Sequence, residues 1–402
     1  MREMKDSGIE WIGEIPAHWK CIKSKYIFNL YSGETLSKEM LIDNGKYPVY
    51  GGGELIGYYN KYNVSEKSIL IGRVGARCGC VTELHQHSWA TDNALIIDAN
   101  QASKYIFFAL VSADLNRLNE SNAQPLITAT KILNNFIVFP PIEEQQKIAS
   151  FLDDKCTEID SLISELKKQT ETLEEYKKSL ITETVTKGLN KNVKMKNSGI
   201  EWVGKIPEHW NTHPIYCYFS ERKNKNSLGL ENNLLSLSYG KIVRRNINSN
   251  DGLLPESFNT YNIVEKDDII IRPTDLQNDK RSLRTAIAKE HGIITSAYIA
   301  MKAIKPVNPK YFHYLLHTYD VMKVFYNMGN GVRQGLNFSE FSRLIVFEPT
   351  IEEQNEIVAF LQEKCTEIDK IISEKKQQIK TIEKYKKSLI FEYVTGKREI
   401  NT

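Results

Sequence analysis

Several features that would assign this sequence to a familiar class are absent. No uninterrupted apolar run approaches the roughly 18 residues needed to cross a bilayer, and the segment Met1–Trp19 is polar. We therefore expect a soluble, cytoplasmic protein. The cysteines form no Cys-x-x-Cys pair and have no histidines at zinc-site spacing, so we expect reduced thiols and no metal site. The six cysteines are Cys21, Cys78, Cys80, Cys156, Cys217 and Cys365.

The sequence also has little net charge. Its 53 basic and 50 acidic residues give a formal charge of +3, which is too small to indicate nucleic-acid binding by itself. Any basic surface must therefore be local. The chain has 402 residues, of which 41% are hydrophobic, and this is enough to form two or three domains.

The sequence does contain an internal repeat. Met4–Trp19 returns almost unchanged as Met195–Trp210, an offset of 191 (195 − 4). Three later motifs return at an offset of 209 (351 − 142): Ile142–Gln145 as Ile351–Gln354, Lys155–Asp160 as Lys364–Asp369, and Tyr176–Ile181 as Tyr385–Ile390.

Between these matching ends lie two divergent blocks, Lys20–Phe139 and Asn211–Phe347. The matching parts are expected to meet a constant partner, and each divergent block is expected to meet something different. Both blocks contain short apolar runs between glycine and asparagine turns, which predict mixed α/β structure with many short strands. Examples are Ser68–Ile71, Ala94–Ile97, Asp268–Ile271 and Tyr298–Met301.

The matching segment after each block predicts a long helix. Thr350 and Glu353 form a capping-box pattern, and a pair of glutamates suits the amino terminus of each helix. Apolar residues then follow a 4-3 spacing typical of a coiled coil. Lysines interrupt both seams, so we expect the two helices to pack against each other, antiparallel. The seam positions are Ile159, Ile163, Leu166, Thr170, Leu173, Lys177 and Leu180, and Ile368, Ile372, Lys375, Ile379, Ile382, Lys386 and Leu389.

These patterns predict an α+β fold in which two long antiparallel coiled-coil helices separate two mixed α/β domains, with a pseudo-two-fold internal repeat. Joining the chain ends would recreate the central junction, so the chain is pseudo-cyclic. The predicted boundaries are 1–140 and 195–349 for the domains, 141–187 and 350–395 for the helices, 188–194 for the linker and 396–402 for the tail.

The doubled Ser-Gly-Ile-Glu-Trp-x-Gly-x-Ile-Pro-x-His-Trp motif, the Ile-Glu-Glu-Gln helix starts and the linker Val185–Leu189 resemble specificity subunits of type I restriction-modification enzymes, over essentially the whole chain. The resemblance implies that two target-recognition domains each recognise one half of a split DNA site. It also implies that the helices bind two modification (methyltransferase) subunits and, through them, restriction (motor and nuclease) subunits. S-adenosylmethionine, ATP and Mg would then be used by these partners, and we expect this chain to bind no cofactor.

Catalytic motifs are missing. Asn308–Tyr311 is the nearest string to a methyltransferase Asn-Pro-Pro-aromatic loop, Gly51–Gly57 is not a G-x-G-x-x-G fingerprint, and no G-x-x-x-x-G-K-[ST] motif is present. We therefore predict a non-catalytic subunit. Two other classes stay open: a stand-alone DNA-binding regulator, which would not bind modification subunits, and a coiled-coil assembly protein, which would not bind DNA sequence-specifically.

In the first block, the candidate DNA contacts lie at turns next to predicted strands. Ile71–Gly79 follows a strand, and its glycines would let the backbone approach a ligand while its arginines reach phosphates or guanine edges. Solvated turns whose polar side chains bond their own backbone are the alternative. The candidates are Arg73, Arg77, Asp92, Asn93 and Gln124.

In the second block, Arg272–Arg284 places four basic residues and a Gln-Asn pair in one loop. Arginine pairs with guanine, and Gln or Asn with adenine, for about 1–3 kcal/mol of discrimination each. A merely solvated loop is the alternative. Candidates outside the loop suit phosphate contacts better. The loop candidates are Arg272, Gln277, Asn278, Lys280, Arg281 and Arg284, and the others are Lys241, Arg244, Arg245, Arg333 and Gln334.

The repeated framework also contains aromatic residues. Because Trp11, Trp19, Trp202 and Trp210 belong to the repeat, we expect them to pack in a core or interface. His18 and His209 precede two of these tryptophans and are expected to be packed, without a catalytic role.

Helix length predicts the layout of the DNA site. Leu162 to Leu180 spans 18 steps, or about 27 Å at roughly 1.5 Å per residue. With flanking turns, the two domains would stand about one DNA turn apart, roughly 34–36 Å. We therefore expect a bipartite site of two different half-sequences around a spacer that is not recognised.

Overall fold

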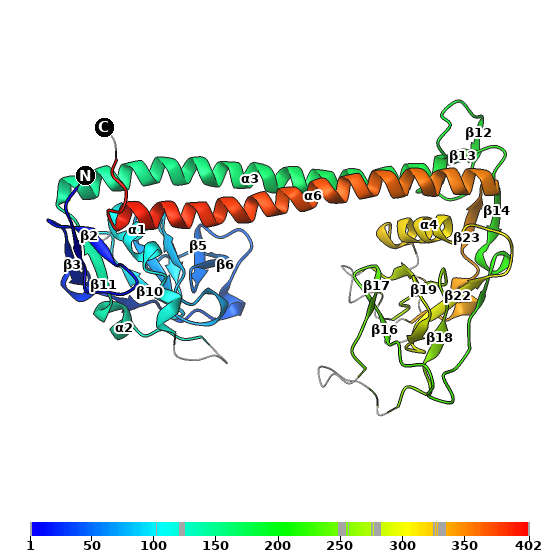
Figure 1. Cartoon of the computed structure of the whole chain (residues 1–402), viewed down its shortest axis with the longest axis horizontal. Coiled ribbons are helices and arrows are strands. Elements are labelled where there is room, and N and C mark those ends of the chain that lie inside the picture. Colours follow the sequence, from blue (N-terminus) through cyan, green and yellow to red (C-terminus); the bar gives the residue numbers. More distant parts are fainter. Residues whose placement is uncertain are drawn as a thin grey trace. The chain divides into compact units, whose positions relative to one another are not determined.

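The computed structural model describes residues 2–101, 103–119, 125–247, 255, 257–274, 276, 283–324, 326, 328 and 335–400. The chain divides into two compact units, Met1–Lys168 with Lys375–Thr402, and Gln169–Glu374. Two long helices, α3 (Ile142–Lys187) and α6 (Ile351–Val394), each contribute one end to each unit (Figure 1). The first unit therefore contains the start of α3 and the end of α6, and the second unit contains the end of α3 and the start of α6.

The first unit is built on a four-stranded antiparallel sheet of order β4-β10-β7-β8. A separate three-stranded sheet has the order β6-β5-β9, and two strand pairs complete the unit. The strands are β1 (Met4–Asp6), β2 (Glu14–Pro16), β3 (Lys20–Lys23), β4 (Tyr31–Ser32), β5 (Tyr47–Gly51), β6 (Glu54–Tyr59), β7 (Ile69–Gly72), β8 (Val81–Glu83), β9 (Trp89–Ala90), β10 (Ala94–Ile97) and β11 (Phe136–Phe139). The helices are α1 (Lys104–Ser112), α2 (Ala129–Asn134) and the 3-10 turns η1 (Ser24–Tyr26), η2 (Lys38–Met40), η3 (Gly75–Arg77) and η4 (Leu115–Leu118).

The second unit repeats this plan. Its four-stranded sheet has the order β15-β22-β19-β20, and the pairs β12-β13 and β14-β23 match β1-β2 and β3-β11. The pairs β16-β17 and β18-β21 complete it. Its strands are β12 (Met195–Asn197), β13 (Lys205–Pro207), β14 (Asn211–Pro214), β15 (Phe219–Glu221), β16 (Leu235–Ser238), β17 (Lys241–Arg244), β18 (Asn262–Val264), β19 (Ile269–Ile271), β20 (Thr285–Ile287), β21 (Gly292–Ile294), β22 (Ile299–Ala303) and β23 (Ile345–Glu348). The helices are η5 (Ile215–Cys217), α4 (Pro309–Val321) and α5 (Phe338–Phe341).

The central strands are apolar because both faces of each four-stranded sheet are buried. In β7, Ile69 and Ile71 pack into the core that contains α1, whereas Leu70 packs on the opposite face against Val64 and Ile96. In β19, Ile269 and Ile271 likewise face the larger core and Ile270 faces a smaller one. The period of two places successive side chains on opposite faces. All four strands predicted from apolar runs are present as β7, β10, β19 and β22.

Within each unit the long helices pack antiparallel (Figure 1). In the first unit, Ile163, Leu166 and Ile379 form a small core, and Lys386 donates to Asp160 at 2.6 Å. In the second unit, Lys177 donates to Asp369 at 2.7 Å. The two ion pairs are equivalent in the repeat. From the Asp160–Lys386 pair to the Lys177–Asp369 pair, the position on α3 increases by 17 residues (177 − 160) and the position on α6 decreases by 17 (386 − 369), as antiparallel helices require. The predicted antiparallel packing is confirmed.

The carboxyl-terminal end of each long helix packs against the domain of the other repeat: α6 ends in the first unit and α3 ends in the second. The Tyr105 hydroxyl donates to the carbonyl oxygens of Val138 and Val394, at 2.9 Å and 3.4 Å. The Tyr311 hydroxyl donates to the Val185 carbonyl at 3.1 Å. Val394 and Val185 occupy equivalent positions and are buried in the cores of the first and second units. The exchange of helix ends follows directly from the antiparallel arrangement.

The described part of the chain contains no helix whose length and apolar character would suit a membrane span.

Candidate nucleic-acid interface

In the first unit, three connections meet beside the carboxyl end of β7. They are the turn between β5 and β6, the β7–β8 connection that contains η3, and the turn before β10. The Arg73 amide donates to the Asn93 carbonyl at 2.9 Å. A side chain built on Gly52 would contact the Asn93 carbonyl oxygen at 3.6 Å and the Arg77 Cβ at 4.0 Å. Four candidates named from sequence, Arg73, Arg77, Asp92 and Asn93, are therefore brought together.

Two glycines at the β7–β8 connection are required by the chain's own packing. A Cβ atom on Gly72 would lie 2.1 Å from the Arg77 carbonyl oxygen, because the β7–β8 connection folds back on the strand. One on Gly79 would lie 2.4 Å from the Asn116 nitrogen. The sequence alone suggested that these glycines admit a ligand. The structure shows a packing reason for Gly72 and Gly79, because each makes close backbone-to-backbone contacts that any other residue would break.

The candidate side chains of this group differ in exposure. Arg77 is exposed and lies 3.7 Å from the Glu54 carboxylate, across the β5–β6 turn. Arg73 is half-buried, whereas Asp92 and Asn93 are exposed in their turn. The turn is partly self-satisfied, since the Thr91 hydroxyl oxygen accepts from the Asn93 amide at 3.4 Å. Gln124 lies outside the described residues.

The second unit places its candidates at the same topological positions. The hairpin β16–β17 carries Lys241, Arg244 and Arg245, all exposed, and the β19–β20 connection begins at Arg272. A Cβ atom on Gly240, at the hairpin tip, would lie 3.1 Å from the Leu283 Cβ, so the tip contacts this connection. Arg244 is held by two bonds from its Nε to the Glu290 carboxylate, at 2.8 Å and 3.0 Å. Part of its charge is therefore already neutralised.

The prediction that Arg284 contacts DNA is wrong. Its side chain is fully buried and donates to the Thr274 carbonyl and to the Tyr326 hydroxyl, so it has no surface to offer to DNA. The Tyr326 hydroxyl donates in turn to Asp320 at 2.9 Å, and the Arg284 amide donates to the other Asp320 oxygen. Burial and the Asp320 carboxylate raise the pKa of Tyr326 to about 12. The arginine fastens the base of the β19–β20 connection.

The remaining candidates of the second block lie outside the described residues: Gln277, Asn278, Lys280, Arg281, Arg333 and Gln334. The chain on either side of them is described. The Arg272 amide donates to the Arg284 carbonyl at 2.8 Å, and the Leu336 amide donates to the Pro273 carbonyl at 3.0 Å. In the first unit, the Ile127 amide donates to the Arg73 carbonyl at 2.9 Å in the same manner. Both units thus bring two connections together at the end of the central strand.

Three residues of this region escaped the sequence analysis. Asp320 and Tyr326 lie far along the chain from Arg284, and no local pattern marks them as its partners. Tyr239, at the tip of the β16–β17 hairpin, is 82% exposed. Its position between a predicted strand and Gly240-Lys241 was the one available signal.

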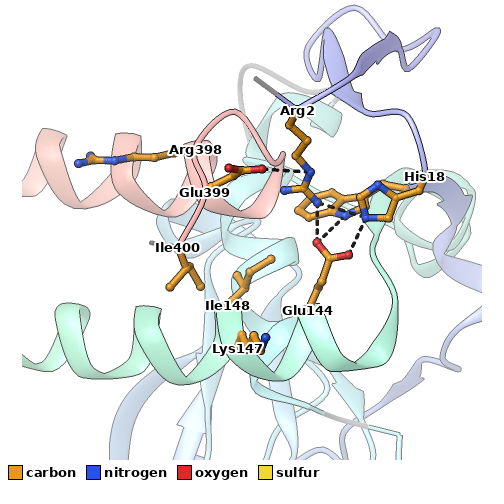
Figure 2. Close-up of a pocket in the computed structure, with 9 residues that line it drawn as sticks. Arg2, His18, Glu144, Lys147, Ile148, Arg398, Glu399 and Ile400 are labelled. Atoms are coloured by element: carbon orange, nitrogen blue, oxygen red, sulfur yellow. Dashed lines mark hydrogen bonds and ion pairs between the residues drawn. The ribbon is translucent and has the colours of Figure 1, made fainter. Parts of the chain in front are cut away.

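The repeated framework supports the long helices at their amino termini. Figure 2 shows Arg2, His18 and Glu144 pointing toward one another beside a pocket of about 370 Å³. His18 bonds Glu144 at 2.6 Å and the Trp19 indole donates to it at 3.0 Å. Burial by itself would raise the pKa of Glu144, but these bonds and the Arg2 charge outweigh it and lower the pKa. Arg2 also lies over the Trp19 ring, 4.7 Å from its centre.

The second helix start uses the same residue types. His209 bonds Glu353 at 2.9 Å and the Trp210 indole donates to Glu353 at 3.5 Å. Glu353 also completes the predicted capping box, since it accepts from the Thr350 amide while the Thr350 hydroxyl accepts from the Glu353 amide. The expected packing of Trp19 and Trp210 is confirmed because both are fully buried. The histidines, expected to be packed, are instead about half-exposed and hydrogen-bond the glutamates at the helix starts.

The chain ends meet in the first unit. Arg2 lies 3.7 Å from Glu399, and the Lys397 ammonium donates to the Ile12 carbonyl. A Cβ atom on Gly396 would approach Pro16 to 2.5 Å. Gly188, just after α3, lies against Trp210 in the second unit, where a Cβ atom would approach the ring to 3.2 Å. Gly396 thus lies against Pro16 and Trp19 of the first repeat as Gly188 lies against Trp210 of the second.

Comparison with known proteins agrees with this architecture. The family described as the type I restriction modification DNA specificity domain matches residues 16–173. The putative type I restriction enzyme MjaX specificity subunit of Methanocaldococcus jannaschii is 27% identical over 69% of this chain, and the match spans 63% of that relative. The MjaVIII specificity subunit of the same organism is 23% identical over 92% of this chain and 85% of the relative.

A solved chain of a type I restriction-modification system has the same fold. Its TM-score is 0.66 at 11% identity, and the alignment covers 96% of this chain and 99% of that chain. The resemblance first seen in the doubled motifs is thus found again in curated proteins, and this chain is similar to specificity subunits of type I restriction-modification enzymes.

Proposed function

We propose that this chain is the sequence-specific DNA-binding subunit of a type I restriction-modification complex and that its two domains recognise the two halves of a bipartite site. One observation carries the proposal. The four-stranded sheets of the two units have equivalent strand orders and the units make equivalent helix contacts, yet the connections at the end of β7 and of β19 differ in sequence. Conserved scaffolds that present different loops are the usual basis of specificity.

The chemistry of these connections supports DNA as the ligand. Arg77 and the basic strand β17 are exposed there, together with Asp92 and Asn93. Arginine and asparagine recognise base edges through paired hydrogen bonds, and lysine and arginine bind phosphates. Because the net charge of the chain is only +3, this local grouping matters more than bulk attraction.

The long helices are the proposed docking surface for two modification subunits, with restriction subunits bound through them. The repeated segments pack in the same way in both units, which suits two copies of one partner. Methylation, ATP use and cleavage are assigned to the partners, together with S-adenosylmethionine, ATP and Mg. We expect the purified chain alone to show none of these activities. An activity of this kind that increases in proportion to the amount of purified chain would refute the assignment of catalysis to the partner subunits.

Mapping methylated sites in a host with and without the gene tests the whole proposal. Loss of one bipartite methylated sequence is expected. Loss without any binding of the purified chain to that sequence would favour the assembly protein, and binding without capture of modification subunits would favour the stand-alone regulator.

The spacer prediction can be tested in the same assay. Four residues inserted in each long helix, after Lys168 and after Glu374, add about 6 Å to each. The spacer should lengthen by one or two base pairs at about 3.4 Å each while both half-sequences stay unchanged. Methylation only at the original spacing would contradict the model.

A further inference from the structure

The turn between β16 and β17 has an unusual composition. Tyr239 and Gly240 are its two central residues, and both have positive φ angles, 46° and 74°. Glycine, asparagine and aspartate are preferred in such turns because a side chain at positive φ meets its own backbone. Tyr239 therefore adopts a conformation that an aromatic residue seldom occupies.

The corresponding turn of the first unit adopts the same backbone conformation without strain, because it is made of glycines. Gly52 and Gly53 occupy the two positions there, with φ angles of 63° and 88°. Tyr239 gains little from the fold in return for its strain, since 82% of the residue is exposed. The stability of the domain does not account for the tyrosine. Strained residues that persist without a packing role tend to lie at binding sites.

The surroundings of Tyr239 indicate the ligand. Its neighbour Gly240 contacts Leu283, which adjoins the buried Arg284 that fastens the β19–β20 connection. On the other side, Lys241 and Arg245 are exposed on and just after β17. No acidic side chain among the described residues pairs with Lys241. An exposed aromatic ring beside cationic side chains is suited to DNA, whose bases have apolar edges and whose backbone is anionic.

We propose that Tyr239 contacts DNA in the half-site recognised by the second domain, with its ring against the apolar edge of a base and Lys241 on a neighbouring phosphate. The proposal rests on the proposed DNA-binding function. It also makes the two domains unlike, because the first domain has Gly52 where the second has Tyr239. The ring is then a determinant of one half-sequence only.

The test measures binding of the full-length chain to two labelled duplexes, one with the site recovered by methylation mapping and one with that site scrambled. Tyr239→Gly copies the turn of the first unit and relieves the strain. Tyr239→Asn removes the ring and keeps a residue that tolerates positive φ. Tyr216→Ala, which removes another exposed tyrosine of the same unit, is the matched control.

Tyr239→Gly and Tyr239→Asn should each bind the specific duplex about tenfold more weakly, leave binding to the scrambled duplex unchanged, and unfold at or above the wild-type temperature. Lys241→Ala should weaken binding to both duplexes equally and lower the salt dependence. Tyr216→Ala should bind like the wild type.

Wild-type affinity in both Tyr239 variants would overturn the inference while leaving the proposed function intact. Normal DNA binding combined with loss of modification-subunit capture would overturn it too, because the ring would then belong to a protein interface. A wild-type chain that does not distinguish the two duplexes would instead refute the proposed function, and the inference with it.

Discussion

The helices α1 and α4 occupy the same place in the two units but differ in chemistry. Tyr105 and Tyr311 are equivalent because each hydroxyl bonds the valine carbonyl near the end of a long helix. Counting from them, Phe107 corresponds to His313, Val111 to His317 and Asp114 to Asp320. The equivalent tyrosines that contact the long helices are thus kept, whereas other residues of α1 and α4 differ between the units.

Asp114 and Asp320 show what this difference does. Asp114 is exposed after α1, whereas Asp320 is fully buried and accepts bonds from the Arg284 amide and the Tyr326 hydroxyl. The same residue type is a surface group in one unit and anchors the base of the β19–β20 connection in the other. A repeat can therefore conserve a side chain without conserving its role.

The largest expected effect is a difference in the free energy of unfolding between variants of these two aspartates. Asp320→Asn should destabilise the second unit by about 3 kcal/mol, because a buried charge network loses its anion and the new amide group faces a donor. Asp114→Asn should change the free energy of unfolding by less than about 0.5 kcal/mol. Denaturant unfolding with hydrogen exchange resolves the two units, and equal effects in both would contradict the comparison.

Acid should affect the second unit more than the first. Burial, then the nearby His317, lowers the pKa of His313 to about 3, and its Nε2 has no partner among the described residues. Between pH 6.5 and pH 3 the unfolded chain binds a proton at His313 that the folded chain does not. The free energy of unfolding is therefore highest above pH 6.5 and decreases as the pH falls toward 3. At pH 5 the loss is about 2 kcal/mol, at roughly 1.4 kcal/mol per pH unit.

His313→Phe introduces the residue that the first unit already has at this position. Unfolding of the variant should lose most of its pH dependence between pH 7 and pH 5 in the second unit. Hydrogen exchange in α1 and α4 at the two pH values measures both units at once. Similar acid sensitivity in α1, which has Phe107 in place of the histidine, would show that the histidine is not responsible.

A smaller asymmetry is expected at the helix starts. Glu144→Gln should cost about 1 kcal/mol, because Arg2 and His18 lose a charged partner. Glu353→Gln should cost about half as much, since glutamine also completes a capping box with Thr350. Thermal unfolding of the two variants gives the difference, and a larger loss for Glu353→Gln would reverse this interpretation.

The smallest effect should be the same in both units. Lys177→Met and Lys386→Met each remove one of the two equivalent ion pairs between the long helices. Their aspartate partners are more than half exposed, so each change should cost about 0.2–1 kcal/mol. Unequal costs beyond this range would show that the two halves of the helical framework are not equivalent.

The sequence was sufficient for the parts of this fold that depend on local pattern. Apolar runs predicted β7 and β19, and the 4-3 spacing with the capping box at Thr350 predicted the long helices. The offset of the repeats predicted the symmetry that Lys177 and Lys386 display. The strands and helices depend on residues that are close together in the chain, where spacing alone determines which face is buried, and the symmetry is visible when the sequence is compared with itself.

The sequence failed where partners come from distant segments. Arg284 had the composition of a DNA contact, but its partners Tyr326 and Asp320 lie 42 and 36 residues away and draw it into the interior. The close backbone neighbours of Gly72 and Gly79 were likewise not evident from the local sequence. Burial of a charged side chain depends on tertiary packing, which no local pattern encodes.

The exchange of helix ends has a consequence for synthesis. By the time Glu374 leaves the ribosome, every residue of the second unit has been made, including its share of α3. The first unit is begun earlier but still lacks Leu389, Ile390, Tyr393 and Val394, which belong to its core. The domain that is translated first is therefore completed last, and its apolar surface stays unfilled until Leu389–Val394 have been synthesised.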